Sequence, residues 1–258
     1  MQNTNIINTF VNTVRKTSNF QVIVNKIYKR IFEQKNSISV ADNLQWIESN
    51  LSSIEELASK LDEKLWEEAK QISKQLTENA NKLLAELAVD LGGGGFYPFL
   101  YFITRYTQPD VIVETGVAAG FSSYAFLKAI DTNKKGSLYS SDFPYFRLPN
   151  PEKYIGIVVE ETLKKYWHLY IDGDEINLPK ILTQVDKIDI FHYDSDKSYS
   201  GRTMAISLIK NKLNDNSLVL MDDIQDNSFF YDYIKKHNPL NWYIFEFDNK
   251  YIGMIGKI

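Results

Sequence analysis

The stretch that decides the fold is VIVETGVAAG, residues 111–120. It begins with an apolar run of the kind that forms a buried strand, and Glu114 ends that run. Two glycines, Gly116 and Gly120, then allow a tight turn into a following helix. In open parallel sheets, a turn of this kind lies at the edge where ligands bind. We therefore expect an α/β fold whose binding site includes residues 114–120.

Strand and helix patterns alternate from residue 96 onward. The expected strands are 111–115, 137–142, 167–171, 188–193 and 217–221, and the expected helices are 96–107, 121–130, 152–166, 175–184, 199–213 and 227–236. Such alternation predicts a parallel sheet with right-handed crossovers. Two final runs, 242–247 and 251–255, leave no room for a helix between them and predict an antiparallel hairpin. The fold class is therefore α/β, a Rossmann-like seven-stranded sheet that is mostly parallel.

A helical N-terminal extension, residues 1–91, is expected ahead of the α/β domain, residues 92–258. Ser52 and Ser53 each precede a glutamate by three residues, which is the capping-box pattern that starts a helix. Apolar residues then recur every three or four positions along 54–87. Such a stripe packs on its own domain or forms the seam of a homo-oligomer, and the first outcome is the commoner.

Composition and charge restrict the classes of function. The chain has no cysteine and three dispersed histidines, so a bound metal should be a hard cation with oxygen ligands. No apolar run is long enough to span a membrane, and the N-terminus is too polar for a signal peptide, so we expect a cytoplasmic protein. Residues 1–36 are basic, either as a solvated helix face or as a contact for an anionic partner. The acidic remainder disfavours nucleic-acid binding.

The glycine turn favours a nucleoside without a diphosphate. Dinucleotide sites use G-x-G-x-x-G, whereas the spacing here is G-x-x-x-G with Ala118 in the middle. Glu114 adds negative charge where a phosphate would need the opposite. Asp142, at the end of the next expected strand, is placed to accept hydrogen bonds from ribose hydroxyls. A structural turn without a ligand is the other interpretation, because glycine spacing alone is weak evidence.

Three further carboxylates follow later strands. Asp194 ends the run 188–193, and Asp222 and Asp223 end the run 217–221. Because the carboxyl ends of parallel strands share one edge, we expect these side chains to converge. Three neighbouring carboxylates repel one another at neutral pH unless a cation lies among them, and Mg²⁺ prefers oxygen ligands of this kind.

Over residues 92–258 the sequence resembles class I S-adenosylmethionine-dependent methyltransferases. The stretch 113–123 is similar to the catechol O-methyltransferase and macrocin/cephalosporin-type O-methyltransferase branches, whose form is E-x-G-x-x-x-G-[aromatic]-S. The resemblance implies that S-adenosyl-L-methionine is the cofactor. The residues it implies for cofactor binding are Glu114, Gly116, Gly120 and Ser122 around the methionine, Asp142 at the ribose, and Asp172 and Gly173 near the adenine.

The same resemblance implies a metal centre and a base. Asp194, Asp222 and Asp223 would bind Mg²⁺, and Lys197 would deprotonate the acceptor hydroxyl, since a nearby divalent cation lowers the pKa of a lysine. A solvated surface lysine is the other interpretation of Lys197. His192 is expected to be a hydrogen-bonded core histidine.

Three hypotheses follow from these residues. The first is a Mg²⁺-dependent O-methyltransferase acting on a hydroxyl of a small molecule or sugar. The second is a metal-independent enzyme that uses S-adenosylmethionine to methylate nitrogen or for another transfer, and the third is a non-catalytic methyltransferase-like binding module. Retention of the full set of acids argues against the third, because repelling carboxylates have no use in an inert scaffold. Aromatic residues at 145, 146 and 229–231 suggest an aromatic or sugar acceptor, or core packing.

Overall fold

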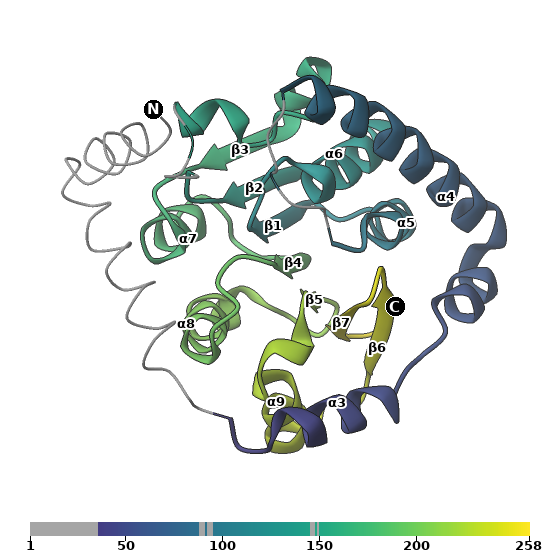
Figure 1. Ribbon diagram of the computed structural model, residues 1–258, viewed down its shortest axis with the longest axis vertical. Helices are drawn as coiled ribbons and strands as arrows, with labels where there is room; N and C mark the ends of the chain where they lie inside the picture. Colours follow the sequence, from purple (N-terminus) through teal and green to yellow (C-terminus); the bar gives the residue numbers. More distant parts are fainter. Residues whose placement is uncertain (1–35, 88–90, 92–94, 145–147, 149) are drawn as a thin grey trace.

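The computed structural model describes residues 36–87, 91, 95–144, 148 and 150–258 (Figure 1). The strands are β1 Val111–Thr115, β2 Ser137–Ser141, β3 Trp167–Tyr170, β4 Ile190–Tyr193, β5 Leu218–Met221, β6 Trp242–Phe247 and β7 Lys250–Ile255. The α-helices in the described residues are α3 Val40–Glu48, α4 Ile54–Leu87, α5 Tyr97–Thr107, α6 Phe121–Asn133, α7 Asp174–Leu182, α8 Tyr199–Ile209 and α9 Phe229–His237. None of the helices in these ranges combines the length and apolar character that a membrane span requires.

All seven strands form one sheet in the order β3-β2-β1-β4-β5-β7-β6. Neighbouring strands from β3 to β5 pair in parallel, whereas β7 is antiparallel to both β5 and β6. The chain turns from β6 into β7 as the expected hairpin, and β7 inserts beside β5 so that β6 becomes the edge strand. The fold class predicted from the sequence is therefore confirmed.

Helices cover both faces of the sheet (Figure 1). Side chains alternate along each strand, so Ile112 joins a core with α4, α5 and α6, and Val113 joins a second core with α7, α8 and α9. Both residues are fully buried. This two-sided burial explains why the central strands β1 and β5 are rich in consecutive apolar residues.

Helix α4 begins at the predicted capping residue, but it is not continuous. The Ser53 hydroxyl accepts a hydrogen bond from the Glu56 amide at 3.2 Å. Asp62 then breaks the helix with φ −163° and ψ 95°, and its carboxylate accepts from the Leu65 amide at 3.0 Å, which caps a new helical segment. The sequence expectation of one unbroken helix is wrong here, because an aspartate can cap a helix as well as lie on its surface.

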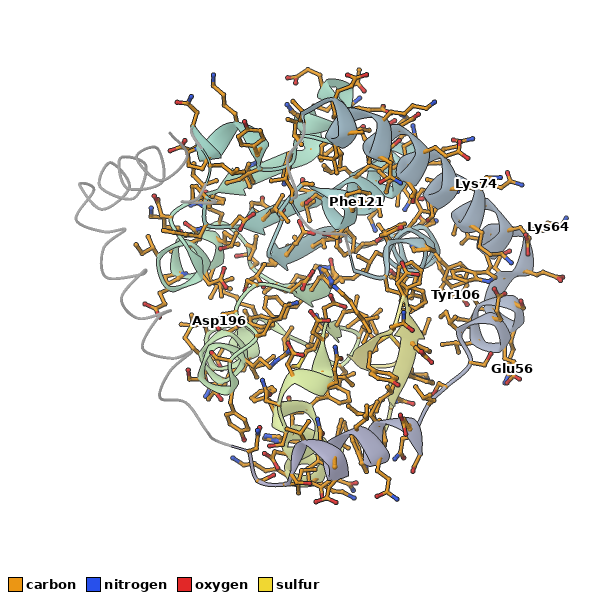
Figure 2. The ribbon with its side chains drawn as sticks, viewed as in Figure 1. Glu56, Lys64, Lys74, Tyr106, Phe121 and Asp196 are labelled. Carbon is orange, nitrogen blue, oxygen red and sulfur yellow. The ribbon has the colours of Figure 1, made fainter. Side chains whose placement is uncertain are left out.

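The apolar stripe of α4 packs on the sheet domain of the same chain. Trp66 is buried and meets the Phe102 ring edge-on at 5.7 Å between centroids. Charged residues of α4, including Glu56, Lys64 and Lys74, point outward from the ribbon (Figure 2). The described part of the extension is thus joined to the sheet domain through its apolar face.

The segment 151–166 differs from its predicted helix. It forms two short 3₁₀ turns, Pro151–Tyr154 and Glu161–Tyr166, separated by irregular chain. Gly156 has φ +68°, a Cβ there would lie 2.2 Å from the Trp167 ring, and its amide donates to the Ala118 carbonyl at 2.9 Å. The segment is bonded to the glycine turn after β1, and this tertiary contact overrides its helical pattern.

Helix α3 covers the far edge of the sheet next to α9 (Figure 1). Ile47 is fully buried in the second core, and Trp46 stacks on Trp242 of β6 at 5.5 Å between ring centroids. The Ser52 amide donates to the Ile244 carbonyl of β6 at 2.8 Å. These contacts fix α3 to the edge strand and to the loops beside it.

Candidate active site

Strand register brings the predicted site residues to one edge of the sheet. Thr115 of β1 pairs with Tyr193 of β4, and Tyr193 pairs with Met221 of β5. The residues that follow these pairs, Gly116, Asp194 and Asp222, are therefore neighbours. The sheet order reverses between β1 and β4, which is where open α/β sheets bind ligands.

The two glycines of the turn permit close packing of loops. Gly116 has φ +83°, and a Cβ there would lie 2.3 Å from the Asp194 carbonyl oxygen. Gly120 precedes α6 with φ +100°, and a Cβ there would lie 2.7 Å from the Gly156 Cα. Both positions therefore require glycine for conformation and for space.

Asp142 lies beside this turn. Its Oδ2 accepts hydrogen bonds from the backbone amides of Val117 and Ala118, at 3.2 and 2.8 Å, and its Oδ1 accepts from the Phe143 amide at 2.6 Å. The carboxylate thus holds the turn in shape. Its role toward a ribose remains a prediction.

Glu114 is fully buried and lies in a cluster of hydroxyls. Its carboxylate accepts from Ser122 at 2.5 Å, from Ser123 at 2.6 Å and from Ser140 at 2.8 Å. The sequence paired Glu114 with Ser122, and the structure brings the two together. Sequence reasoning missed Ser123 and Ser140, although Ser140 pairs with Glu114 in the strand register.

The turn after β3 carries two aspartates, Asp172 and Asp174, which have different partners. Asp172 is half-exposed and pairs with Lys180 at 3.0 Å. Gly173 has φ +89° and precedes α7. Asp174, in the same predicted turn, accepts hydrogen bonds from Ser141 at 2.6 Å and from Ser195. It therefore links the ends of β2 and β4, whereas Asp172 and Gly173 stay predicted adenine contacts.

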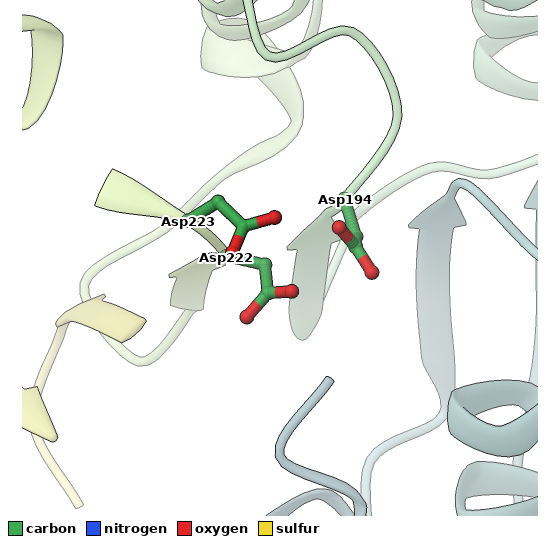
Figure 3. A group of neighbouring side chains, drawn as sticks. All are labelled: Asp194, Asp222 and Asp223. Atoms are coloured by element: carbon green, nitrogen blue, oxygen red, sulfur yellow. The ribbon is translucent and has the colours of Figure 1, made fainter. Parts of the chain in front are cut away.

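The structure brings Asp194, Asp222 and Asp223 together (Figure 3). One oxygen from each lies within 4.8 Å of the others. Asp222 is fully buried, and both of its carboxylate oxygens lack a hydrogen-bond partner. Burial and the neighbouring Asp194 raise the pKa of Asp222 to about 7. A buried carboxylate without hydrogen bonds, beside two more carboxylates, is a donor set that fits a hard divalent cation.

Lys197 reaches into the same cluster. Its Nζ contacts Asp194 Oδ1 and lies 2.6 Å from Asp223 Oδ2 and 3.9 Å from Asp222 Oδ2. Burial alone would lower the pKa of Lys197, but the three carboxylates outweigh it and raise that pKa. The carboxylates thus shift the pKa of Lys197 upward, whereas the sequence led us to expect a pKa lowered by a nearby cation.

The pKa of Asp223, which is ion-paired with Lys197, shifts downward. Burial would raise the pKa of Asp223, but the Lys197 ammonium and the more distant Lys250 hold it below its ordinary value. Asp223 also has a left-handed backbone, with φ 50°. The turn that presents the two acids is therefore strained as well as charged.

Arg202 supports this turn and was not singled out in the sequence. It is buried in α8, and its Nη2 donates to the carbonyl oxygens of Asp222 and Asp223, both at 2.9 Å. Its guanidinium also lies 5.7 Å from the centre of the Tyr193 ring. The signal was weak because an arginine within a helix normally lies at the surface.

His192 is buried, as expected, but its hydrogen bonding is not complete. Its Nδ1 lies 3.8 Å from Glu114 Oε1 and makes no hydrogen bond. Burial would lower the pKa of His192, but the carboxylates of Glu114, Asp194 and Asp222 outweigh it and raise that pKa. The expectation of a fully hydrogen-bonded core histidine is therefore wrong in part.

Most of the remaining residues considered in the sequence analysis are either buried in the core or outside the described part of the chain. Phe229 and Phe230 are core side chains, which supports packing over acceptor contact for both. Residues 92–94, 145 and 146 lie outside the described residues. Gly95 is described, and a Cβ there would lie 3.2 Å from Asp222 Oδ2. The backbone at residue 95 therefore lies directly against the buried carboxylate.

The chain is similar to known proteins in one matched domain and in its fold. Residues 113–224 match the family model described as "Methyltransferase domain". No curated protein matches the chain. Several solved structures share the fold at low sequence identity.

Three of these structures are informative. A putative caffeoyl-CoA O-methyltransferase from Staphylococcus aureus is 12% identical with a TM-score of 0.54, covering 70% of this chain and 91% of that one. The O-methyltransferase TomG from Streptomyces achromogenes, solved with SAM, is 12% identical with a TM-score of 0.54, covering 71% and 89%. An O-methyltransferase from Bacillus cereus in complex with SAH is 13% identical with a TM-score of 0.53, covering 82% and 100%.

The resemblance to class I methyltransferases stated from the sequence is confirmed. Residues 113–224 match a methyltransferase domain, and the sheet has the fold of the O-methyltransferase structures described above. The matched range 113–224 contains the glycine turn, Lys197 and all three clustered aspartates.

Proposed function

We propose that the protein is an S-adenosylmethionine-dependent O-methyltransferase that uses a divalent cation, Mg²⁺ by preference, and methylates a hydroxyl of a small molecule or sugar. The observation that carries this proposal is the convergence of three aspartates beside the glycine turn, with both Asp222 oxygens buried and without a hydrogen bond. A buried carboxylate without hydrogen bonds is costly, and a bound cation would provide a strong interaction for it.

The glycine turn supports the cofactor assignment. Glu114 and Asp142 place two carboxylates around it, and each is held by several hydrogen bonds. Such an acidic surrounding suits a neutral or positively charged ligand, as the sulfonium of S-adenosylmethionine is, better than a diphosphate. The bound SAM and SAH in two of the fold neighbours support the same choice.

Asp194, Asp222 and Asp223 would hold the metal. When bound, a divalent cation supplies polarisation of the acceptor hydroxyl and lowers the pKa of that hydroxyl. The chain's own contribution is the Lys197 amine, which lies among these acids and would accept the hydroxyl proton as the O–CH₃ bond forms and the S–CH₃ bond breaks. A bound cation would add positive charge to the cluster. That charge would lower the pKa of Lys197, against the raising effect of the carboxylates.

A metal-independent methyltransferase is the second candidate. The observation that favours it is the position of Lys197, whose ammonium contacts or approaches all three carboxylates and so offsets part of their charge without an ion. In that case Lys197 would be an ion-pair partner of the acids and not a base.

Calorimetry separates these candidates. We expect S-adenosylhomocysteine to bind with micromolar affinity, and Mg²⁺ to bind the native protein but not Asp222→Ala, which keeps its affinity for S-adenosylhomocysteine. Asp226→Ala is the matched control, because Asp226 is exposed and lies outside the cluster. Methyl transfer to a panel of hydroxyl acceptors should then stop when a chelator is added. Unchanged turnover in chelator would select the metal-independent candidate, and no binding of the nucleoside would reject both.

A further inference from the structure

Two asparagines connect the N-terminal extension to the candidate base. Asn43 of α3 is buried, and its Nδ2 donates to the carbonyl oxygens of Ile224 and Asn227, at 3.3 and 3.2 Å. The Asn227 Nδ2 in turn donates to the Lys197 carbonyl oxygen at 2.6 Å. Two side-chain amides in series therefore reach from α3 to the backbone of Lys197.

The bonded segments are the ones that carry the site. Lys197 lies in the loop between β4 and α8, and Ile224 directly follows the Asp222-Asp223 turn. Neither loop is held by a strand ladder, and the second contains only the 3₁₀ turn Ile224–Asp226. Loop backbone of this kind depends on side-chain hydrogen bonds for its position. The asparagine pair supplies such bonds to both loops.

Helix α3 is a firm support for this connection. Ile47, one turn after Asn43, is fully buried, and the Ser52 amide pairs with the Ile244 carbonyl of β6. Before the helix, the Ser37 amide donates to the Ser228 hydroxyl at 3.0 Å. Asn43 is thus presented by a helix that is fixed at both ends.

The chemistry of Asn43 also indicates a role beyond packing. Its Oδ1 is buried and makes no hydrogen bond. A buried amide oxygen without a partner destabilises the fold, so an apolar side chain would suit a position used for packing alone. What the position uses is the NH₂ group, and both of its hydrogen bonds go to the loop that follows the acid pair.

We propose that Asn43 is a positioning residue of the methyltransferase site, acting through Asn227 to hold Lys197 against the aspartate cluster. The N-terminal extension is then part of the catalytic unit. The catalytic side of this inference rests on the proposed function, whereas its structural side, the tethering of the lysine loop, stands on the hydrogen bonds alone.

The decisive experiment compares Asn43→Ala with Ile47→Ala. Both residues lie on the buried side of α3, but Ile47 packs in the core and makes no side-chain hydrogen bond to either loop. We expect Asn43→Ala to speed amide hydrogen exchange in peptides covering 195–199 and to lower kcat about 10–100-fold without changing KM for S-adenosylmethionine. Ile47→Ala should lower Tm and leave both readouts at their native values at a temperature where it is folded.

Further variants keep the test decisive. Asn43→Ser is the substitute if Asn43→Ala does not fold, since it keeps a small polar group that is too short to reach both carbonyls. Asn227→Ala should reproduce the exchange and kcat changes, and the double variant should be no worse than the more affected single variant, because the two amides act in series.

The outcomes separate this inference from the proposed function. Native exchange at 195–199 in Asn43→Ala, or the same acceleration in Ile47→Ala, would overturn the inference. If the protein transfers no methyl group, the proposed function fails while the exchange comparison still decides whether Asn43 holds the lysine loop. Faster exchange with an unchanged kcat would leave Asn43 a structural tether only and reject its positioning role.

Discussion

The Lys197 ammonium nitrogen lies 2.6 Å from Asp223 Oδ2, so the proposed base is ion-paired with a proposed metal ligand. An ammonium and a divalent cation at this place require the same oxygens. Binding of the cation must therefore weaken the ion pair, which links metal binding to the release of the lysine.

This competition predicts that Lys197→Met will strengthen metal binding and weaken methyl transfer. Removal of the competing ammonium should raise the affinity for Mn²⁺ about tenfold, which corresponds to ~1.4 kcal/mol. The same change should lower methyl transfer about 10²–10⁴-fold, because the proton acceptor is lost. Mn²⁺ binding can be measured by electron paramagnetic resonance and transfer by release of S-adenosylhomocysteine.

Lys250→Met provides the control for this prediction. Its Nζ lies 3.8 Å from the other oxygen of Asp223, so it shares the partner without entering the cluster as closely. We expect a smaller gain in Mn²⁺ affinity and near-native transfer. Weaker Mn²⁺ binding by Lys197→Met would contradict competition between the two cations.

A second prediction compares two glycines at opposite ends of the sheet. Gly116→Ala would place a Cβ 2.3 Å from the Asp194 carbonyl, and Gly136→Ala would place one 2.4 Å from the Pro109 carbonyl. Both glycines have positive φ, 83° and 100°. Each alanine should therefore destabilise the fold by about 1–3 kcal/mol.

Only the first of these variants should damage the site. Gly116→Ala displaces the chain that carries Asp194, so it should weaken binding of both S-adenosylhomocysteine and Mg²⁺ by calorimetry. Gly136 lies before β2, at the other end of the strands, and its variant should bind both normally when folded. Equal loss of binding in the two variants would show that general destabilisation is the cause.

Much of the fold could be predicted because its signals are local. Apolar runs such as 111–113 give strands, and Gly116 and Gly120 mark the turn that follows the first of them. Parallel topology then places Asp194 and Asp222 on one edge without further information. The convergence of the aspartates was predictable for this reason.

The features that were missed depend on contacts distant in sequence. The segment around Gly156 is irregular because the Gly156 amide is hydrogen-bonded to the Ala118 carbonyl. The neighbouring sequence contains no pattern that predicts this bond. The Asn43 amide contacts residue 227, which is 184 positions away in the chain. Residue type alone does not distinguish a buried asparagine or arginine from an exposed one, so Asn43 and Arg202 could not be singled out from the sequence.

A third prediction concerns stability and pH. Burial and Asp194 raise the pKa of the folded Asp222 carboxyl from 3.8 to about 7. Between these values the folded state binds a proton that the unfolded state releases, so this group makes the metal-free protein less stable as pH rises from about 4 to about 7. Asp222→Asn, which is always neutral, should lack this decline and be about 1–3 kcal/mol more stable than the native protein at pH 8.

Urea unfolding in a chelator at pH 5 and at pH 8 measures this difference. Asp110→Asn is the control of opposite sign, because Lys187 and Lys135 lower the pKa of Asp110, and its stabilising effect is lost only as pH falls below about 4. Between pH 5 and 8 its slope should match that of the native protein. Saturating Mg²⁺ should remove the decline in the native protein, since the bound cation favours the ionised Asp222. Identical slopes for the native protein and Asp222→Asn in chelator would mean that Asp222 ionises normally, and the argument for a cation at this carboxylate would lose its main support.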